Sequence, residues 1–121
     1  MSHHCHIERT LRAGGLRQTK KRHRLLAYFQ EKRAWSAAEL HRRLGGGHLS
    51  TVYRNLHDLL KNGIISEVQL HGEESRYELA RSPHHAHLVC SRCSRAECVP
   101  CPVRSQTDHS LEMRGLCSLC Q

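Results

Sequence analysis

The residues of this chain that could do chemistry are concentrated beyond residue 82, where six of the seven cysteines lie. Four of them form two CxxC pairs, Cys90 with Cys93 and Cys117 with Cys120. Two such pairs at this separation predict one tetrahedral zinc site with four thiolate ligands and no open coordination position. We therefore expect a structural zinc ion.

A third pair with the same spacing, Cys98 and Cys101, lies between the other two. It could replace one of the outer pairs, hold a second metal, or act as a redox couple. His84, His85 and His87 come just before the first pair. Because side chains alternate along a strand, His85 and His87 would lie on one side and could meet one ion.

Composition indicates the kind of partner. The 121 residues carry a formal net charge of +8, which favours a polyanion, nucleic acid first. The apolar runs are only a few residues long, so we expect no membrane partner. Cysteines that serve as thiols and metal ligands favour a reducing compartment, and we expect a cytoplasmic protein.

A change of composition near Ser82-Pro83 predicts two domains, residues 1–82 and residues 83–121. The second piece has few large apolar side chains, and chains of fewer than about 40 residues usually need a metal or disulfides to fold. The four-cysteine site would therefore supply stability that a core of this size lacks.

The first piece shows the pattern of a winged helix-turn-helix. A short helix over 5–13 precedes Gly14-Gly15, and Thr19 can cap a second helix. Ser36 to Glu39 is a capping box, and Ser50 is the predicted cap of a recognition helix over 50–62 that buries Val52, Leu56, Leu59 and Leu60. Period-two alternation around a turn at 71–74 then predicts a hairpin, the wing.

The second piece is predicted to be rich in strands, near 85–90, 95–99 and 109–113. Only 23 residues separate Cys93 from Cys117, and Pro100 and Pro102 discourage a long helix between them. The fold class is therefore α+β: a winged helix-turn-helix followed by a small, zinc-clamped, β-rich domain.

Several motifs, in order along nearly the whole chain, resemble the ferric uptake regulator family. They are Ala13-Gly14-Gly15-Leu16-Arg17-x-Thr19, Ser36-Ala37-x-Glu39-Leu40, Ser50-Thr51-Val52-Tyr53-Arg54-Asn55-Leu56, Arg76-Tyr77-Glu78-Leu79, His84-His85-x-His87-Leu88-x-Cys90-x-x-Cys93 and His109-Ser110-Leu111 through Gly115-x-Cys117. The resemblance implies a dimeric, metal-dependent transcriptional repressor with an N-terminal DNA-binding domain and a C-terminal dimerisation domain. Here the second domain is shorter than usual.

The resemblance also implies a regulatory metal site between wing and dimerisation domain. Its matching ligands are Glu78, His85 and His87, with Cys98 where an acidic ligand is common. Ala34 stands where the family uses a histidine. A softer ligand set favours Zn²⁺ over Fe²⁺ or Mn²⁺ and the zinc uptake regulator branch as the candidate subgroup.

Other metal ligands are candidates as well. His71, on the wing turn, could supply the missing nitrogen. His84 and His109 match a third metal site of some family members, although Ala86 replaces one of its acidic ligands. Cys101 is the last candidate.

DNA contact is expected from the recognition helix. Tyr53 can pack on a thymine methyl group or bond a phosphate, and Arg54 can reach a phosphate or a guanine edge. Arg17 matches a basic residue that reaches the minor groove. The remaining DNA-binding candidates are Thr19, Arg22, Ser50, Thr51 and Asn55.

The sequence thus predicts a zinc-sensing repressor that binds an A·T-rich inverted repeat as a homodimer. The alternatives are an iron-responsive repressor, or a truncated regulator that acts by pairing with a full-length relative. A thiol redox enzyme using Cys98 and Cys101 would need strand-helix-strand context, which the sequence lacks, so we expect neither an enzyme nor a small organic substrate.

Overall fold

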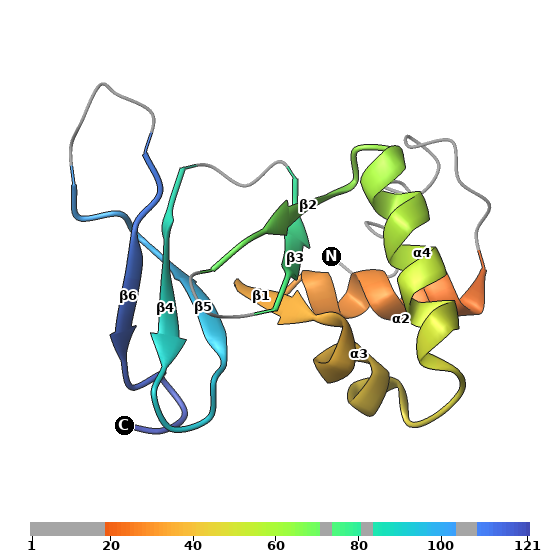
Figure 1. The fold of residues 1–121 in the computed structure, drawn as a ribbon, viewed down its shortest axis with the longest axis horizontal. Helices are drawn as coiled ribbons and strands as arrows, with labels where there is room; N and C mark the ends of the chain where they lie inside the picture. The colour runs from red at the N-terminus through yellow and green to blue at the C-terminus, as the bar shows by residue number, and fades with distance from the viewer. Residues whose placement is uncertain (1–18, 71–73, 81–83, 104–108) are drawn as a thin grey trace, which may run out of the picture.

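The chain folds as three helices followed by a strand-rich region in a computed structural model that describes residues 19–70, 74–80, 84–103 and 109–121 (Figure 1). The described elements are α2 (Lys20–Phe29), β1 (Arg33–Ser36), α3 (Ala37–Leu44), α4 (Leu49–Lys61), β2 (Ile65–Val68), β3 (Arg76–Leu79), β4 (Ala86–Cys90), β5 (Ala96–Val99) and β6 (Glu112–Gly115). The helices gather at one end and β4 to β6 at the other, which confirms the predicted α+β class. The helix expected over 5–13 lies outside the described residues.

The helix starts follow the capping signals, with one exception. The Thr19 hydroxyl accepts from the Arg22 backbone N–H at 3.2 Å, and the capping box between Ser36 and Glu39 is complete. The prediction that Ser50 caps the recognition helix is wrong: α4 begins at Leu49, with His48 as the N-cap. Because the Thr51 N–H already donates to the His48 carbonyl, Ser50 lies inside the first turn.

The main hydrophobic core lies between the three helices and the wing hairpin. Val52, Leu56 and Leu59 of α4 are buried there as the helical period predicted, while Leu60 packs at its margin. Residues of α2, β1 and α3 complete the core, among them Leu25, Leu26, Phe29, Trp35 and Leu40. This packing fixes the outer face of α4 relative to the wing.

One sheet, in the order β2-β3-β1-β5-β4-β6, runs through both predicted domains. Strand β1, which the sequence pattern did not predict, pairs antiparallel with β3 through Trp35 and Tyr77 and with β5 through Ala34 and Ala96. The wing is therefore hydrogen-bonded, through β1, to the strands beyond residue 83.

Two of the three strands beyond residue 83, β4 and β5, lie at the predicted positions. The third, β6, starts later than expected and runs parallel to β4, with Leu88 opposite Met113. The small core here consists of Ala34, Leu70, Val89 and Ala96. Within the described part of the chain, no helix combines the length and apolar character needed to cross a bilayer.

Candidate functional site: metal centres and a DNA-binding face

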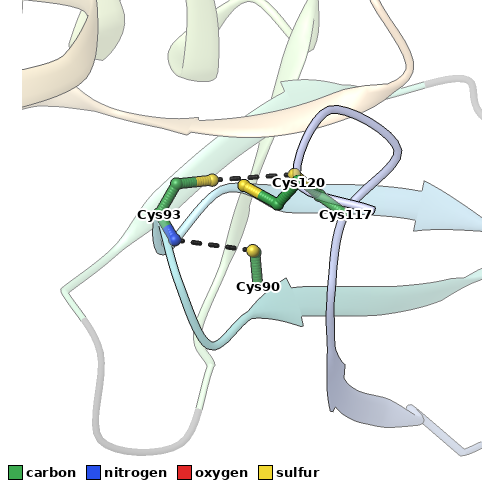
Figure 2. Close-up of side chains that lie close together, drawn as sticks. All are labelled: Cys90, Cys93, Cys117 and Cys120. Atoms are coloured by element: carbon green, nitrogen blue, oxygen red, sulfur yellow. Dashed lines mark hydrogen bonds between the residues drawn. The ribbon is translucent and has the colours of Figure 1, made fainter.

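Four cysteines converge where the ends of β4 and β6 meet (Figure 2). Cys90 ends β4, Cys93 follows in its turn, and Cys117 and Cys120 lie just beyond β6. Their sulfur atoms all lie within 4.8 Å of one another, and Cys93 Sγ is 3.7 Å from Cys117 Sγ. Zn–S bonds of 2.3 Å in a tetrahedron place sulfurs about 3.8 Å apart, so the geometry fits zinc.

The electrostatics of these thiols favour a bound cation. Backbone hydrogen bonds from Cys117 and Cys93 lower the pKa of Cys90 to about 6. The neighbouring Cys117 thiol, together with burial, raises the pKa of Cys120 to about 12. A single thiolate therefore forms readily, whereas four adjacent thiolates need a divalent ion to offset their charge.

A carboxylate that the sequence analysis overlooked holds the second zinc loop. Glu97 of β5 accepts hydrogen bonds from the backbone N–H of Ser118 at 3.1 Å and from its hydroxyl at 2.7 Å. These bonds lower the pKa of Glu97. Ser118 lies between Cys117 and Cys120, so Glu97 orients the loop that carries both.

A second cluster brings together the four predicted regulatory ligands. Glu78 Oε2 lies 2.9 Å from His85 Nε2, 3.0 Å from His87 Nε2 and 3.1 Å from Cys98 Sγ. The two imidazole nitrogens are 3.2 Å apart, close to the roughly 3.3 Å that a tetrahedral ion with 2.0–2.1 Å bonds to nitrogen requires. The donors come from β3, from β4 and the residue before it, and from β5.

The protonation state of this cluster is strongly perturbed. Burial alone would raise the pKa of Glu78, but hydrogen bonds from the two histidines and the thiol outweigh it and lower that pKa to about 2. Burial and the Glu78 carboxylate raise the pKa of Cys98 to about 12. A metal ion at this cluster would therefore bind a Glu78 carboxylate that is already deprotonated, and it would displace the proton of the Cys98 thiol.

The position where the family carries a histidine cannot contribute a ligand. Ala34 is fully buried and faces Ala96 across the pairing of β1 with β5. A cavity of about 500 Å³, lined in part by Glu78, His85 and Cys98, lies against the cluster and offers a path for a metal ion. His71 lies outside the described residues.

A third cluster consists of His84, Cys101 and His109. His84 Nε2 and Cys101 Sγ lie 3.2 Å and 3.4 Å from His109 Nε2. Cys101 was predicted as a ligand separately from the two histidines, and the structure places it beside them. The thiols of Cys98 and Cys101 thus belong to different clusters, which favours metal ligation over a redox couple.

The outer face of α4 presents the predicted DNA-contacting residues. Ser50, Tyr53 and Arg54 are exposed, and Thr51 and Asn55 are partly exposed. Tyr53, at 47% exposure, is a large apolar side chain with little cover from the protein. Such a face is available to a DNA groove.

Two of the predicted DNA contacts have other partners. The Arg22 guanidinium pairs with Asp58 of α4 at 2.8 Å and is largely buried, so it ties α2 to α4. The Thr19 hydroxyl caps α2. Arg17 lies outside the described residues.

Comparison with known proteins identifies the class. The model of the ferric uptake regulator family matches residues 13–115. The ferric uptake regulation protein of Legionella pneumophila is 35% identical over 86 residues, 60% of this chain and 63% of that protein. That of Campylobacter upsaliensis is 27% identical over 134 aligned positions, 94% of this chain and 86% of that protein. The ferric uptake regulator of Vibrio cholerae superposes with a TM-score of 0.71 at 30% identity, covering 90% of this chain and 98% of that one.

The chain therefore belongs to the ferric uptake regulator family of metal-responsive, DNA-binding transcriptional regulators and is not an enzyme. It has a four-cysteine structural zinc site and additional clusters of histidine, glutamate and cysteine. The alignment with the Campylobacter protein is longer than the 121 residues here, so that relative has residues without a counterpart in this chain.

Replacing Cys90 by Ser should remove the structural zinc and unfold the strands beyond residue 83, because their small apolar core does not hold them without the metal. Zinc content and amide hydrogen exchange of β4 to β6 measure this. Cys101→Ser is the matched control and should retain that zinc. A Cys90→Ser protein with full zinc content and unchanged exchange would contradict the assignment.

Proposed function

We propose that this chain is a zinc-responsive repressor and that Glu78, His85, His87 and Cys98 form its regulatory site. The observation that carries the proposal is the position of these donors, since one comes from the wing strand β3 and the others come from β4, the residue before it, and β5. A metal ion bound there joins the wing to the small C-terminal sheet. Loading of the site and the position of the wing are then linked.

The donor set supports zinc. It offers one carboxylate oxygen, two imidazole nitrogens and one thiolate within 4.8 Å, a mixed set of four that suits a tetrahedral ion. Fe²⁺ and Mn²⁺ prefer more ligands and harder ones. A further imidazole nitrogen is missing here, because buried Ala34 stands where the family uses a histidine. An iron-responsive repressor remains the alternative, because the relatives described above are named for ferric uptake regulation.

Metal binding and DNA binding are coupled in this account. The wing hairpin and α4 share the main core, so a metal that fixes β3 also fixes the recognition helix. If the metal binds more tightly to the DNA-competent arrangement, bound DNA tightens the metal by the same factor. We propose an A·T-rich inverted repeat as operator and a homodimer as the binding species.

The third cluster is proposed as an accessory metal site with His84, Cys101 and His109 as ligands. His84 is exposed, and Cys101 and His109 are partly buried. An ion bound at this cluster would therefore exchange more readily than the structural zinc.

A second candidate function follows from the shortened chain. A regulator with a reduced dimerisation domain could act by pairing with a longer relative, and the spacing of only 23 residues between Cys93 and Cys117 favours this alternative. Salt dependence separates the two, because direct DNA binding weakens steeply with salt whereas pairing through apolar faces does not.

Replacing Arg54 by Ala should weaken operator binding at least about tenfold, because an exposed guanidinium on the outer face of α4 would lose its phosphate or base contact. Fluorescence anisotropy on labelled DNA measures the affinity, and zinc content should not change. Arg92→Ala, which removes an equal charge from the zinc loop, should have little effect. Equal affinities for Arg54→Ala and the unchanged protein would refute this role.

Replacing His87 by Ala should abolish the metal dependence of DNA binding while the structural zinc stays bound, because the regulatory ion loses one of four ligands. Anisotropy with and without added zinc, together with zinc content, gives both readouts. The matched control is His84→Ala, a neighbouring histidine from the third cluster. Undiminished activation by zinc in His87→Ala would rule out the regulatory assignment.

Zinc affinity at the regulatory site should rise about tenfold per pH unit between pH 7.5 and 9, because the pKa of Cys98 lies near 12 and binding must displace its proton. The protonated thiol predominates below that pKa, so higher pH favours the metal-bound form. Competition against a chelator measures the slope. Cys98→Ser should flatten the slope, and an equally steep slope in that variant would show that another group releases the proton.

A further inference from the structure

Arg76 lies on β3, a strand with a neighbour on each side in the sheet. It is the first residue of β3 and pairs with Ser36 of β1 on one side and Val68 of β2 on the other. The residue is only 3% exposed. A buried guanidinium depends on the partners that offset its charge.

The two ends of this guanidinium bind different parts of the molecule. One nitrogen, Nη1, donates to Glu39 Oε1 at 2.8 Å, and the other, Nη2, donates to the Ser94 carbonyl oxygen at 2.7 Å. Glu39 belongs to the first turn of α3, a helix of the DNA-binding part. Ser94 directly follows the zinc ligand Cys93.

The Ser94 carbonyl belongs to the first zinc loop. The Ser94 N–H donates to the Cys90 carbonyl at 2.9 Å, and the Cys90 N–H donates to the Arg95 carbonyl at 2.8 Å. Ser94 has a φ of 65°, in the left-handed region that a residue with a side chain seldom adopts. The surrounding structure must hold such a conformation, and zinc bound to Cys90 and Cys93 fixes the loop that contains it.

The Glu39 carboxylate organises the start of α3. It accepts the Ser36 backbone N–H at 3.0 Å in the capping box and also pairs with Arg33. Arg76 is therefore bonded to the same carboxylate that sets where α3 begins. The main core in turn packs α3 against α4.

We propose that Arg76 is a positioning residue that transmits the state of the four-cysteine zinc site to the helix-turn-helix. With zinc bound, the Ser94 carbonyl holds one end of the guanidinium and the other end holds Glu39. When zinc leaves, the strands beyond residue 83 lose their order, and the buried guanidinium loses the Ser94 carbonyl as an acceptor, which is costly. It shifts away from Glu39 and loosens the first turn of α3. The proposal rests on the structural zinc site and not on the identity of the regulatory metal or the operator.

Amide hydrogen exchange of residues 37–44 in the full chain tests this proposal. All samples carry His87→Ala and His109→Ala, which disable the other two clusters, and are compared with zinc and after its removal by a chelator. In this background, zinc removal should speed exchange in α3 by about tenfold or more. With Arg76→Met added, α3 should exchange fast in both states, so that the zinc effect falls below about twofold.

Arg22→Met is the matched control, because it breaks another arginine ion pair of the helices without touching the zinc loop, and it should keep the full zinc effect. Glu39→Gln, which retains the size of the side chain, weakens the ion pair with Arg76 and should also reduce the effect of zinc on exchange in α3. The proposal is wrong if zinc removal leaves α3 unchanged in the background, or if Arg76→Met and Glu39→Gln keep the full zinc effect. Neither DNA nor regulatory metal enters the assay, so its outcome is independent of the proposed function.

Discussion

The backbone pairing of β1 with both β3 and β5 is the constraint on which the rest of this structure depends. Four residues join the wing hairpin to the C-terminal strands in one sheet. Because of this pairing, the carboxylate of Glu78 reaches the imidazoles of His85 and His87 and the thiol of Cys98. Without it, the wing and the C-terminal strands would not offer their donors to one ion. The same pairing buries Ala34, and the cluster comprises four donors among the residues that the structure describes.

Both the bound zinc and the backbone pairing of the sheet stabilise the C-terminal region. Its core is small, with two alanines among four buried residues, and gives little hydrophobic stabilisation. The four-cysteine site closes the ends of β4 and β6, and Glu97 fixes the second of its loops. Arg76 connects the first loop to Glu39 of α3. The structural zinc is thus tied to both the sheet and the DNA-binding helices.

Much of this arrangement was predictable from the sequence, for identifiable physical reasons. The capping box at Ser36 and the CxxC pairs are local patterns whose chemistry dictates their geometry. The grouping of His85 and His87 follows from strand alternation, while Glu78 and Cys98 followed from the family resemblance.

Other features depend on partners distant in the chain. Strand β1 escaped prediction because all four of its residues are buried, so it shows no alternation. The start of β6 is set by its parallel partner β4. Arg22 was assigned to DNA from its charge, but its pairing with Asp58 depends on how α2 and α4 pack. Neither Glu97 nor Arg76 carries a sequence signal for its role.

We propose that zinc, bound at the cluster of Glu78, His85, His87 and Cys98, controls DNA binding. The most direct test is fluorescence anisotropy of the reduced, full-length chain on DNA from upstream of its own gene, with Zn²⁺, Fe²⁺ and Mn²⁺ titrated separately. Zinc alone should tighten binding strongly, and a chelator should reverse the effect. Equal tightening by iron or manganese would contradict zinc selectivity, and the absence of binding with every metal would contradict the repressor itself.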